Sequence, residues 1–133
     1  WGGLGIMWGK NIATVYIRPQ RYTKEFVDAN DLFTVSFLPE SQRKALNICG
    51  SISGREVEDK WEMAGLSSFL CRWHHRRQGG PIWYSCAKKQ YHQEMKPEFF
   101  DVPENDTKWY PDKDYHVMYM AEIVKVLKKG MMK

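Results

Sequence analysis

The residues best suited to bind an anion lie in one short turn, Arg18-Pro-Gln-Arg-Tyr-Thr23. Its two guanidinium groups are planar forks of N–H donors, and Pro19 should end the preceding strand because proline cannot donate to a sheet. Thr23 is a good N-cap for the helix expected next, whose first N–H groups are unpaired and carry partial positive charge. The turn therefore predicts an anion site, although a capped helix with solvated arginines explains the same residues.

A second candidate is the loop Cys49-Gly-Ser-Ile-Ser-Gly-Arg55, which is followed by Asp59 and Lys60. Its two glycines permit a tight backbone that can approach a ligand, and its serines supply small donors. Such a loop also serves as an ordinary turn between two helices. Both interpretations remain open on these residues alone.

The third candidate is a rigid aromatic turn, Lys108-Trp-Tyr-Pro-Asp-Lys-Asp-Tyr-His116, which enters the last expected strand. A histidine at the mouth of a barrel can hydrogen-bond a ligand or transfer a proton near neutral pH. It can equally be satisfied by local hydrogen bonds. Aromatic residues make up 14% of the chain, which favours either a small β-rich core or stacking on a planar ligand.

Strands at both ends of the chain, with short helices between them, must position these three stretches. The apolar periodicity and the turn residues define each element. In chain order we expect strands at 4–8 and 11–17 turning at Gly9-Lys10, a helix at 24–29, a strand at 32–38, a helix at 41–49 ending at Gly50, a helix at 56–64 closed by Gly65, and a strand at 115–127. The predicted fold is mainly β with peripheral helices, a small β-barrel.

The bulk composition bounds the class of protein. A chain of 133 residues with 43% hydrophobic and 27% charged residues fits one globular domain, and a scattered net charge of +4 argues against nucleic-acid binding. Cys49, Cys71 and Cys86 are odd in number and lack paired spacing, so we expect reduced thiols and a cytoplasmic protein. No apolar run approaches the roughly 20 residues that span a bilayer, and we expect no membrane partner.

Taken together and in order, several stretches resemble the flavin-reductase-like, flavoredoxin-type FMN-binding proteins. The resemblance covers nearly the whole chain outside one central segment and rests on Trp1–Gly5, Asn11–Thr23, Phe33–Phe37, Arg43–Ala45, Cys49–Arg55, Asp59-Lys60, Lys96–Phe99 and Trp109–His116. It implies an FMN-binding split β-barrel and a homodimer that holds FMN non-covalently near the subunit interface. It also implies reduction of that flavin by NADH, NADPH or a redox partner protein.

Carried over residue by residue, the resemblance implies nine cofactor-binding positions. They are Trp1 at the end of the phosphate and ring loop, Arg18, Arg21 and Thr23 in the phosphate turn, Ser53, Arg55 and Lys60 in the loop and helix that approach the flavin, and Trp109 and His116 in the aromatic turn. Because the flavin itself carries the chemistry, we name no catalytic acid or base. The expected activity is that of an NAD(P)H-dependent FMN oxidoreductase, and the alternative is a non-enzymatic FMN-binding electron carrier.

Two features depart from the resemblance. The first is that the family's usual N-terminal strand is not found before Trp1, and we do not expect Trp1 to be a translation start. We therefore expect one flavin-reductase-like domain over residues 1–133 that lacks this strand. The second is that residues 67–85 match no element of the family. One interpretation of this segment is a metal site formed by Cys71, His74, His75 and Cys86. Another is a basic nucleic-acid patch formed by Arg72, Trp73, Arg76 and Arg77. Zinc ligands usually come in repeated short spacings, and we expect no metal. Our hypothesis is that the segment was read in a shifted frame, which a measured intact mass matching the printed sequence would contradict.

Overall fold

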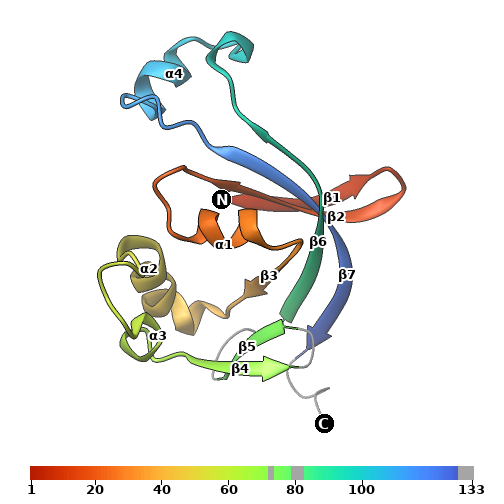
Figure 1. The fold of residues 1–133 in the computed structure, drawn as a ribbon, viewed down its shortest axis with the longest axis vertical. Helices are drawn as coiled ribbons and strands as arrows, with labels where there is room; N and C mark the ends of the chain where they lie inside the picture. Colours follow the sequence, from red (N-terminus) through yellow and green to blue (C-terminus); the bar gives the residue numbers. More distant parts are fainter. Residues whose placement is uncertain (72–73, 79–82, 129–133) are drawn as a thin grey trace. The chain divides into compact units, whose positions relative to one another are not determined.

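The structure is a computed structural model that describes residues 1–71, 74–78 and 83–128, with the side chains of 67–84 and 128 outside the description (Figure 1). Five strands form one sheet in the order β1-β2-β7-β6-β3: β1 Gly2–Met7, β2 Lys10–Ile17, β3 Leu32–Phe37, β6 Trp83–Glu94 and β7 Val117–Lys128. A separate pair consists of β4 Ser67–Cys71 and β5 His74–Gln78. The helical segments are α1 Thr23–Ala29, η1 Glu40–Gln42, α2 Arg43–Ser51, α3 Lys60–Met63, η2 Pro97–Phe99 and α4 Glu104–Trp109. The mainly β prediction with peripheral helices is confirmed.

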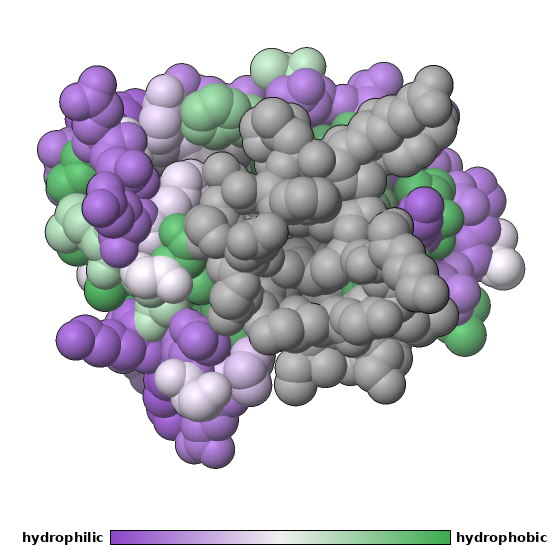
Figure 2. All heavy atoms as spheres, turned by 90° about the horizontal axis from the view of Figure 1, so that it is seen from below, coloured by the Kyte–Doolittle hydropathy of each residue, from purple (hydrophilic) through white to green (hydrophobic). Residues whose placement is uncertain are grey.

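The chain divides into two compact units. The first comprises residues 1–31 and 88–122, and the second comprises residues 32–87 and those from 123 onward. Among the described residues, no helix has both the length and the apolar character needed to cross a membrane. On the face shown in Figure 2, hydrophilic side chains prevail among the described residues, with hydrophobic ones interspersed.

The first unit begins with the predicted hairpin of β1 and β2, which pair antiparallel from Gly2↔Val15 to Met7↔Lys10. The turn residues are Trp8 and Gly9, with φ angles of 54° and 67°, rather than the predicted Gly9-Lys10. Two successive positive φ angles define the hairpin turn whose twist matches that of its strands. Gly2 permits the close approach of the strands, because a Cβ atom there would lie 2.2 Å from the Thr14 carbonyl oxygen.

The helix α1 is fastened to the sheet through its last turn. The Tyr119 hydroxyl of β7 donates to Asp28 Oδ1 at 2.6 Å, and Lys24 Nζ donates to Asp28 Oδ2 at 2.6 Å. Lys89 Nζ of β6 donates to the Val27 carbonyl at 2.6 Å and to the Asp28 carbonyl at 3.1 Å, which satisfies carbonyls at the helix end. These bonds fix α1, and with it the turn that precedes it, to β6 and β7.

The second unit has a small core beneath α2 and α3. Ala45, Ala64 and Leu66 are buried there, and Trp61 packs against them. Lys60 Nζ donates to the Cys49 carbonyl at 2.6 Å and so joins the two helices.

Several predicted helix boundaries are wrong. Tyr22, rather than Thr23, occupies the N-cap of α1 and makes no side-chain cap bond. Gly50 lies inside α2, which ends at Ser51 with Ile52 as its C-cap. The helix predicted over 56–64 shrinks to the single turn of α3, because the Asp59 carboxylate accepts from the Glu62 N–H and starts the helix there.

The anomalous segment contains a strand pair. The backbones of β4 and β5 pair antiparallel from Ser67↔Gln78 to Cys71↔His74. The side chains invoked by the metal and basic-patch interpretations lie outside the described residues, apart from the buried Cys86. The hypothesis of a shifted reading frame therefore stays a prediction.

Candidate functional site

In the first unit, the predicted site residue Trp1 contacts two others, Trp109 and His116, which lie in the aromatic turn. The Trp1 ring stacks on the His116 ring with centroids 5.2 Å apart and planes at 20°. Trp109 contacts Trp1 edge-on at 6.2 Å. Trp1 is 79% exposed and Trp109 45% exposed, whereas His116 is buried. Two large aromatic surfaces are thus open to solvent above a buried imidazole.

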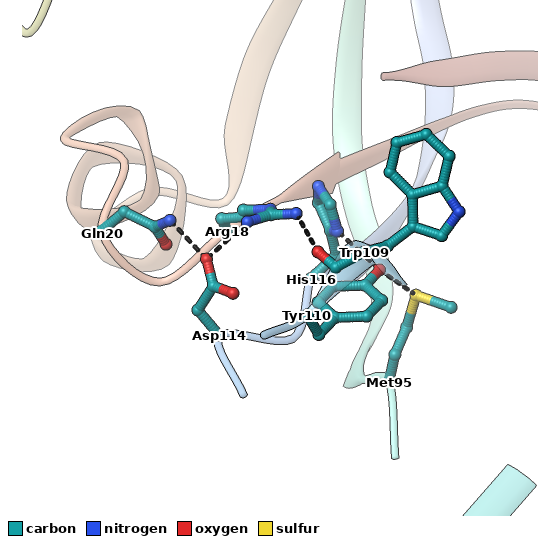
Figure 3. Close-up of polar contacts among 7 residues, drawn as sticks. All are labelled: Arg18, Gln20, Met95, Trp109, Tyr110, Asp114 and His116. Carbon is teal, nitrogen blue, oxygen red and sulfur yellow. Dashed lines mark hydrogen bonds and ion pairs between the residues drawn. The ribbon is translucent and has the colours of Figure 1, made fainter. Parts of the chain in front are cut away.

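Arg18 joins this group from the end of β2 (Figure 3). Its Nη1 pairs with Asp114 Oδ2 at 2.7 Å, and its Nη2 donates to the Trp109 carbonyl at 2.6 Å. The guanidinium carbon lies 5.2 Å from the centroid of the Tyr110 ring, a cation–π contact. Gln20 Nε2 also donates to Asp114 Oδ2. Arg18 therefore binds the aromatic turn at its beginning and near its end.

Tyr110 and His116 form the buried part of the site. The Tyr110 hydroxyl lies 2.8 Å from His116 Nδ1 and 3.7 Å from Met95 Sδ. The Met95 N–H donates to the His116 carbonyl at 2.9 Å and fixes the backbone of the histidine. Burial lowers the pKa of His116 below its usual 6.5, and the nearby Arg18 lowers it further, against the opposing charge of Asp114. The imidazole is accordingly neutral at pH 7.

This lowered pKa predicts a loss of stability in mild acid. A buried histidine whose pKa is lower in the folded protein contributes stability above the pKa of the unfolded chain, and that stability is lost as the pH falls from about 6.5 through the folded value. Chemical denaturation at several pH values between 7.5 and 5 should show the decline, and His116→Gln should flatten it. His92→Gln, which removes an exposed histidine, is the matched control. An equal decline in all three proteins would contradict the assignment.

Arg21 and Thr23, both exposed, lie in the turn that follows Arg18. The Arg21 N–H donates to the Arg18 carbonyl at 3.1 Å, and the Lys24 N–H donates to the Arg21 carbonyl at 2.9 Å. The three predicted phosphate residues therefore belong to one ordered turn. Of these, Arg18 has both guanidinium ends directed at the aromatic turn.

Ser53, Arg55 and Lys60 belong to the second unit. Ser53 Oγ accepts from the Arg55 N–H at 3.2 Å, and the Ser53 carbonyl accepts from the Glu56 N–H at 3.1 Å, which makes a tight serine turn. Lys60 is half-buried and its ammonium group donates to the Cys49 carbonyl, so it has a structural contact. Arg55 is exposed.

Several residues that shape the site were not among the predicted site residues. Asp114, Tyr110, Gln20 and Met95 all enter it through long-range contacts. Asp106 also supports the turn, because its carboxylate accepts from Tyr115 and from Lys113, a residue with a φ of 57°. The two aspartates of the Pro-Asp-Lys-Asp sequence at 111–114 are the signal from which carboxylates that order this turn could have been predicted.

No family model matches the chain, and no curated protein sequence matches it. Several solved structures are similar to the chain. One is an FMN-binding protein from Thermus thermophilus with bound 1-cyclohex-2-enone (TM-score 0.68, 21% identity), and the match covers all of this chain and 62% of the Thermus protein. Flavoredoxin from Methanosarcina acetivorans (TM-score 0.71, 14% identity) matches 98% of this chain and 59% of its own.

A third match is the FMN-binding domain of a flavin reductases-like enzyme from Shewanella baltica (TM-score 0.67, 17% identity), over 95% of this chain and 57% of its own. The chain has the split-barrel fold of the flavin reductase-like FMN-binding proteins. This confirms the fold that the sequence resemblance implied. The split barrel described here spans about 60% of the length of the proteins it matches.

Proposed function

We propose that this split barrel belongs to an oxidoreductase that binds FMN non-covalently and passes reducing equivalents through it. The observation that carries the proposal is the exposed Trp1 and Trp109 pair over a neutral, buried His116, in the same unit as the exposed cation Arg21. Aromatic faces suit a planar tricyclic ring, and a guanidinium suits a phosphate. The residues present therefore fit the two chemical ends of FMN.

Each proposed ligand has a distinct part. Arg21 and Thr23 would hold the phosphate through charge-assisted and hydroxyl hydrogen bonds, and Trp1 and Trp109 would cover one face of the ring. Ser53, Arg55 and Lys60 of the second unit stay predictions from the sequence resemblance, and within that unit Ser53 Oγ accepts from the Arg55 N–H and Lys60 donates to the Cys49 carbonyl. When bound, FMN supplies the capacity to accept and release hydride or single electrons. The protein would supply orientation, charge for the phosphate and exclusion of water.

The proposed reductant is NADH or NADPH, with a redox partner protein as the other source of electrons. The chain also has the fold of the Streptomyces globisporus NADH:FAD oxidoreductase, which supports a nicotinamide nucleotide. We expect purified protein to carry FMN and to accelerate NADH or NADPH oxidation when FMN is present. FMN binding without faster oxidation would favour the non-enzymatic electron carrier, and a colourless protein that binds no added FMN would refute both.

We further propose a cytoplasmic homodimer. The strand β1 is at one edge of the sheet and carries Leu4 and Ile6 on one face, both of them more than half exposed. Burying such a strip against a second copy would remove apolar area from water. Sedimentation should give a dimer at micromolar concentration, and Ile6→Lys should shift it to monomer. A stable monomer of the unaltered protein that retains flavin would contradict the proposal.

A further inference from the structure

We propose that Arg18 is a positioning residue that holds the aromatic turn 109–116 to the end of β2, and that it is not a ligand of the flavin phosphate. The inference rests on the proposed function and refines it at one residue. Arg18 shares one turn with Arg21 and Thr23, and its role follows from its own contacts with the aromatic turn.

The first step is the direction of the Arg18 side chain. Its two terminal nitrogens reach Asp114 Oδ2 and the Trp109 carbonyl, 96 and 91 residues away in the sequence. The side chains of Arg18 and Asp114 are 25% and 16% exposed, so the ion pair is largely withdrawn from water. A rigid fork with two directional bonds positions its partners more firmly than a point charge does.

The second step is what those bonds position. The bond from Arg18 to the Trp109 carbonyl fixes the start of the turn, and with it the residue that carries the exposed indole ring. Tyr110 follows directly, lies under the guanidinium and contacts His116 Nδ1. His116 in turn supports the stacked Trp1 ring. Every aromatic group proposed to meet the flavin ring is thus connected to Arg18.

The third step is charge. Asp114 offsets the positive charge of Arg18, and its Oδ1 is buried with no hydrogen-bond partner among the described residues. A phosphate dianion beside Arg18 would face this carboxylate and be repelled by it. Arg21 is exposed and is the cation of this turn that we propose for the phosphate.

Comparison of FMN with riboflavin, which has the ring but no phosphate, separates the two roles. We expect Arg18→Gln and Asp114→Asn to weaken the binding of FMN and of riboflavin by the same factor, roughly tenfold or more. The reason is that each substitution breaks a charge-assisted bond that holds the turn. Arg21→Gln should weaken the binding of FMN and leave the binding of riboflavin unchanged. Arg18→Lys, which keeps the charge but loses the fork, should resemble Arg18→Gln in a milder form.

Asp114→Asn is the sharpest of these variants. A carboxylate cannot bind a phosphate, and its removal should strengthen FMN binding if Arg18 were a phosphate ligand. Loss of FMN affinity alone in Arg18→Gln, or tighter FMN binding in Asp114→Asn, would therefore overturn the proposal.

Titration of His116 by NMR tests the same arrangement without flavin. Burial, Arg18, the Trp1 amino group and Arg21 lower the pKa of His116, Asp114 raises it, and the Tyr110 hydroxyl contacts the ring. We expect the pKa to rise in Arg18→Gln and to fall in Asp114→Asn, and an unmoved pKa in both would overturn the proposal. If the unaltered protein binds neither flavin, the proposed function fails, while this titration still decides whether Arg18 holds the turn.

Discussion

Replacing Tyr119 with alanine should lower the free energy of unfolding by about 3–5 kcal/mol, the usual cost of truncating a buried aromatic side chain. Tyr119 is the largest fully buried side chain among the described residues, and its ring lies 5.8 Å from that of His92. Its hydroxyl donates to Asp28, so the variant loses the packing of β7 and one of the bonds that attach α1. Urea denaturation should show a lower midpoint with an unchanged slope.

Two further variants separate the contribution of the buried ring to stability from that of the hydroxyl group. Tyr119→Phe keeps the ring and removes only the bond to Asp28, which should cost about 1 kcal/mol because the carboxylate keeps Lys24 and is partly exposed. Tyr91→Ala removes an exposed tyrosine from β6 and should change stability by less than about 0.5 kcal/mol. A loss in Tyr119→Ala no larger than that in Tyr91→Ala would contradict the buried position of Tyr119.

The bond between Tyr119 and Asp28 also has a pH signature. Burial alone would raise the pKa of Asp28, but hydrogen bonds from Lys24 and Tyr119 and the charges of Lys24 and Lys89 hold it below 3.8. A carboxyl group with a lowered pKa in the folded protein contributes stability above the unfolded value, and that stability is lost as the pH falls further. The attachment of α1 therefore weakens only in strong acid, well below the range in which His116 acts.

The strands could be predicted because their signals are local. Alternating β-branched and aromatic residues mark β2 and β7, and a glycine between two apolar runs marks the first hairpin. The helix over 56–64 was wrong for an equally local reason, since Ser53 and Asp59 offer side-chain oxygens to the backbone and divide the segment into a turn and a short helix.

The site was harder to predict than the strands. The three candidate stretches were found from residue types alone, and the structure brings the turn of Arg18 and the turn of Trp109 into contact. The sequence could not reveal that Asp114 is the partner of Arg18, because nothing local links residues 96 positions apart. Two arginines in one turn look alike in a sequence, and the tertiary partners of Arg18 are seen only in the structure.

Replacing Arg18 and Arg21 together with alanine should weaken FMN binding by several kcal/mol at most, about 3–6 if each charged hydrogen bond contributes ~1.5–3. The dissociation constant would then rise by roughly two to four orders of magnitude. The loss would have two origins, because Arg21→Ala removes an exposed charge from the phosphate and Arg18→Ala releases the turn that carries Trp109. Only the first part should shrink at high salt, since salt screens exposed charges more than buried ones.

Fluorescence titration of the flavin measures this affinity, and a charge-matched control is available in the same chain. Lys88→Ala with Lys125→Ala removes two exposed cations from β6 and β7, so it lowers the net charge equally without touching the turn. We expect this control to bind FMN as the unaltered protein does. An unchanged FMN affinity in the double arginine variant, or an equal loss in the lysine control, would show that the turn at Arg18 and Arg21 does not hold the phosphate end of the flavin. In that case the remaining proposed cation is Arg55, on the loop whose backbone Ser53 orders.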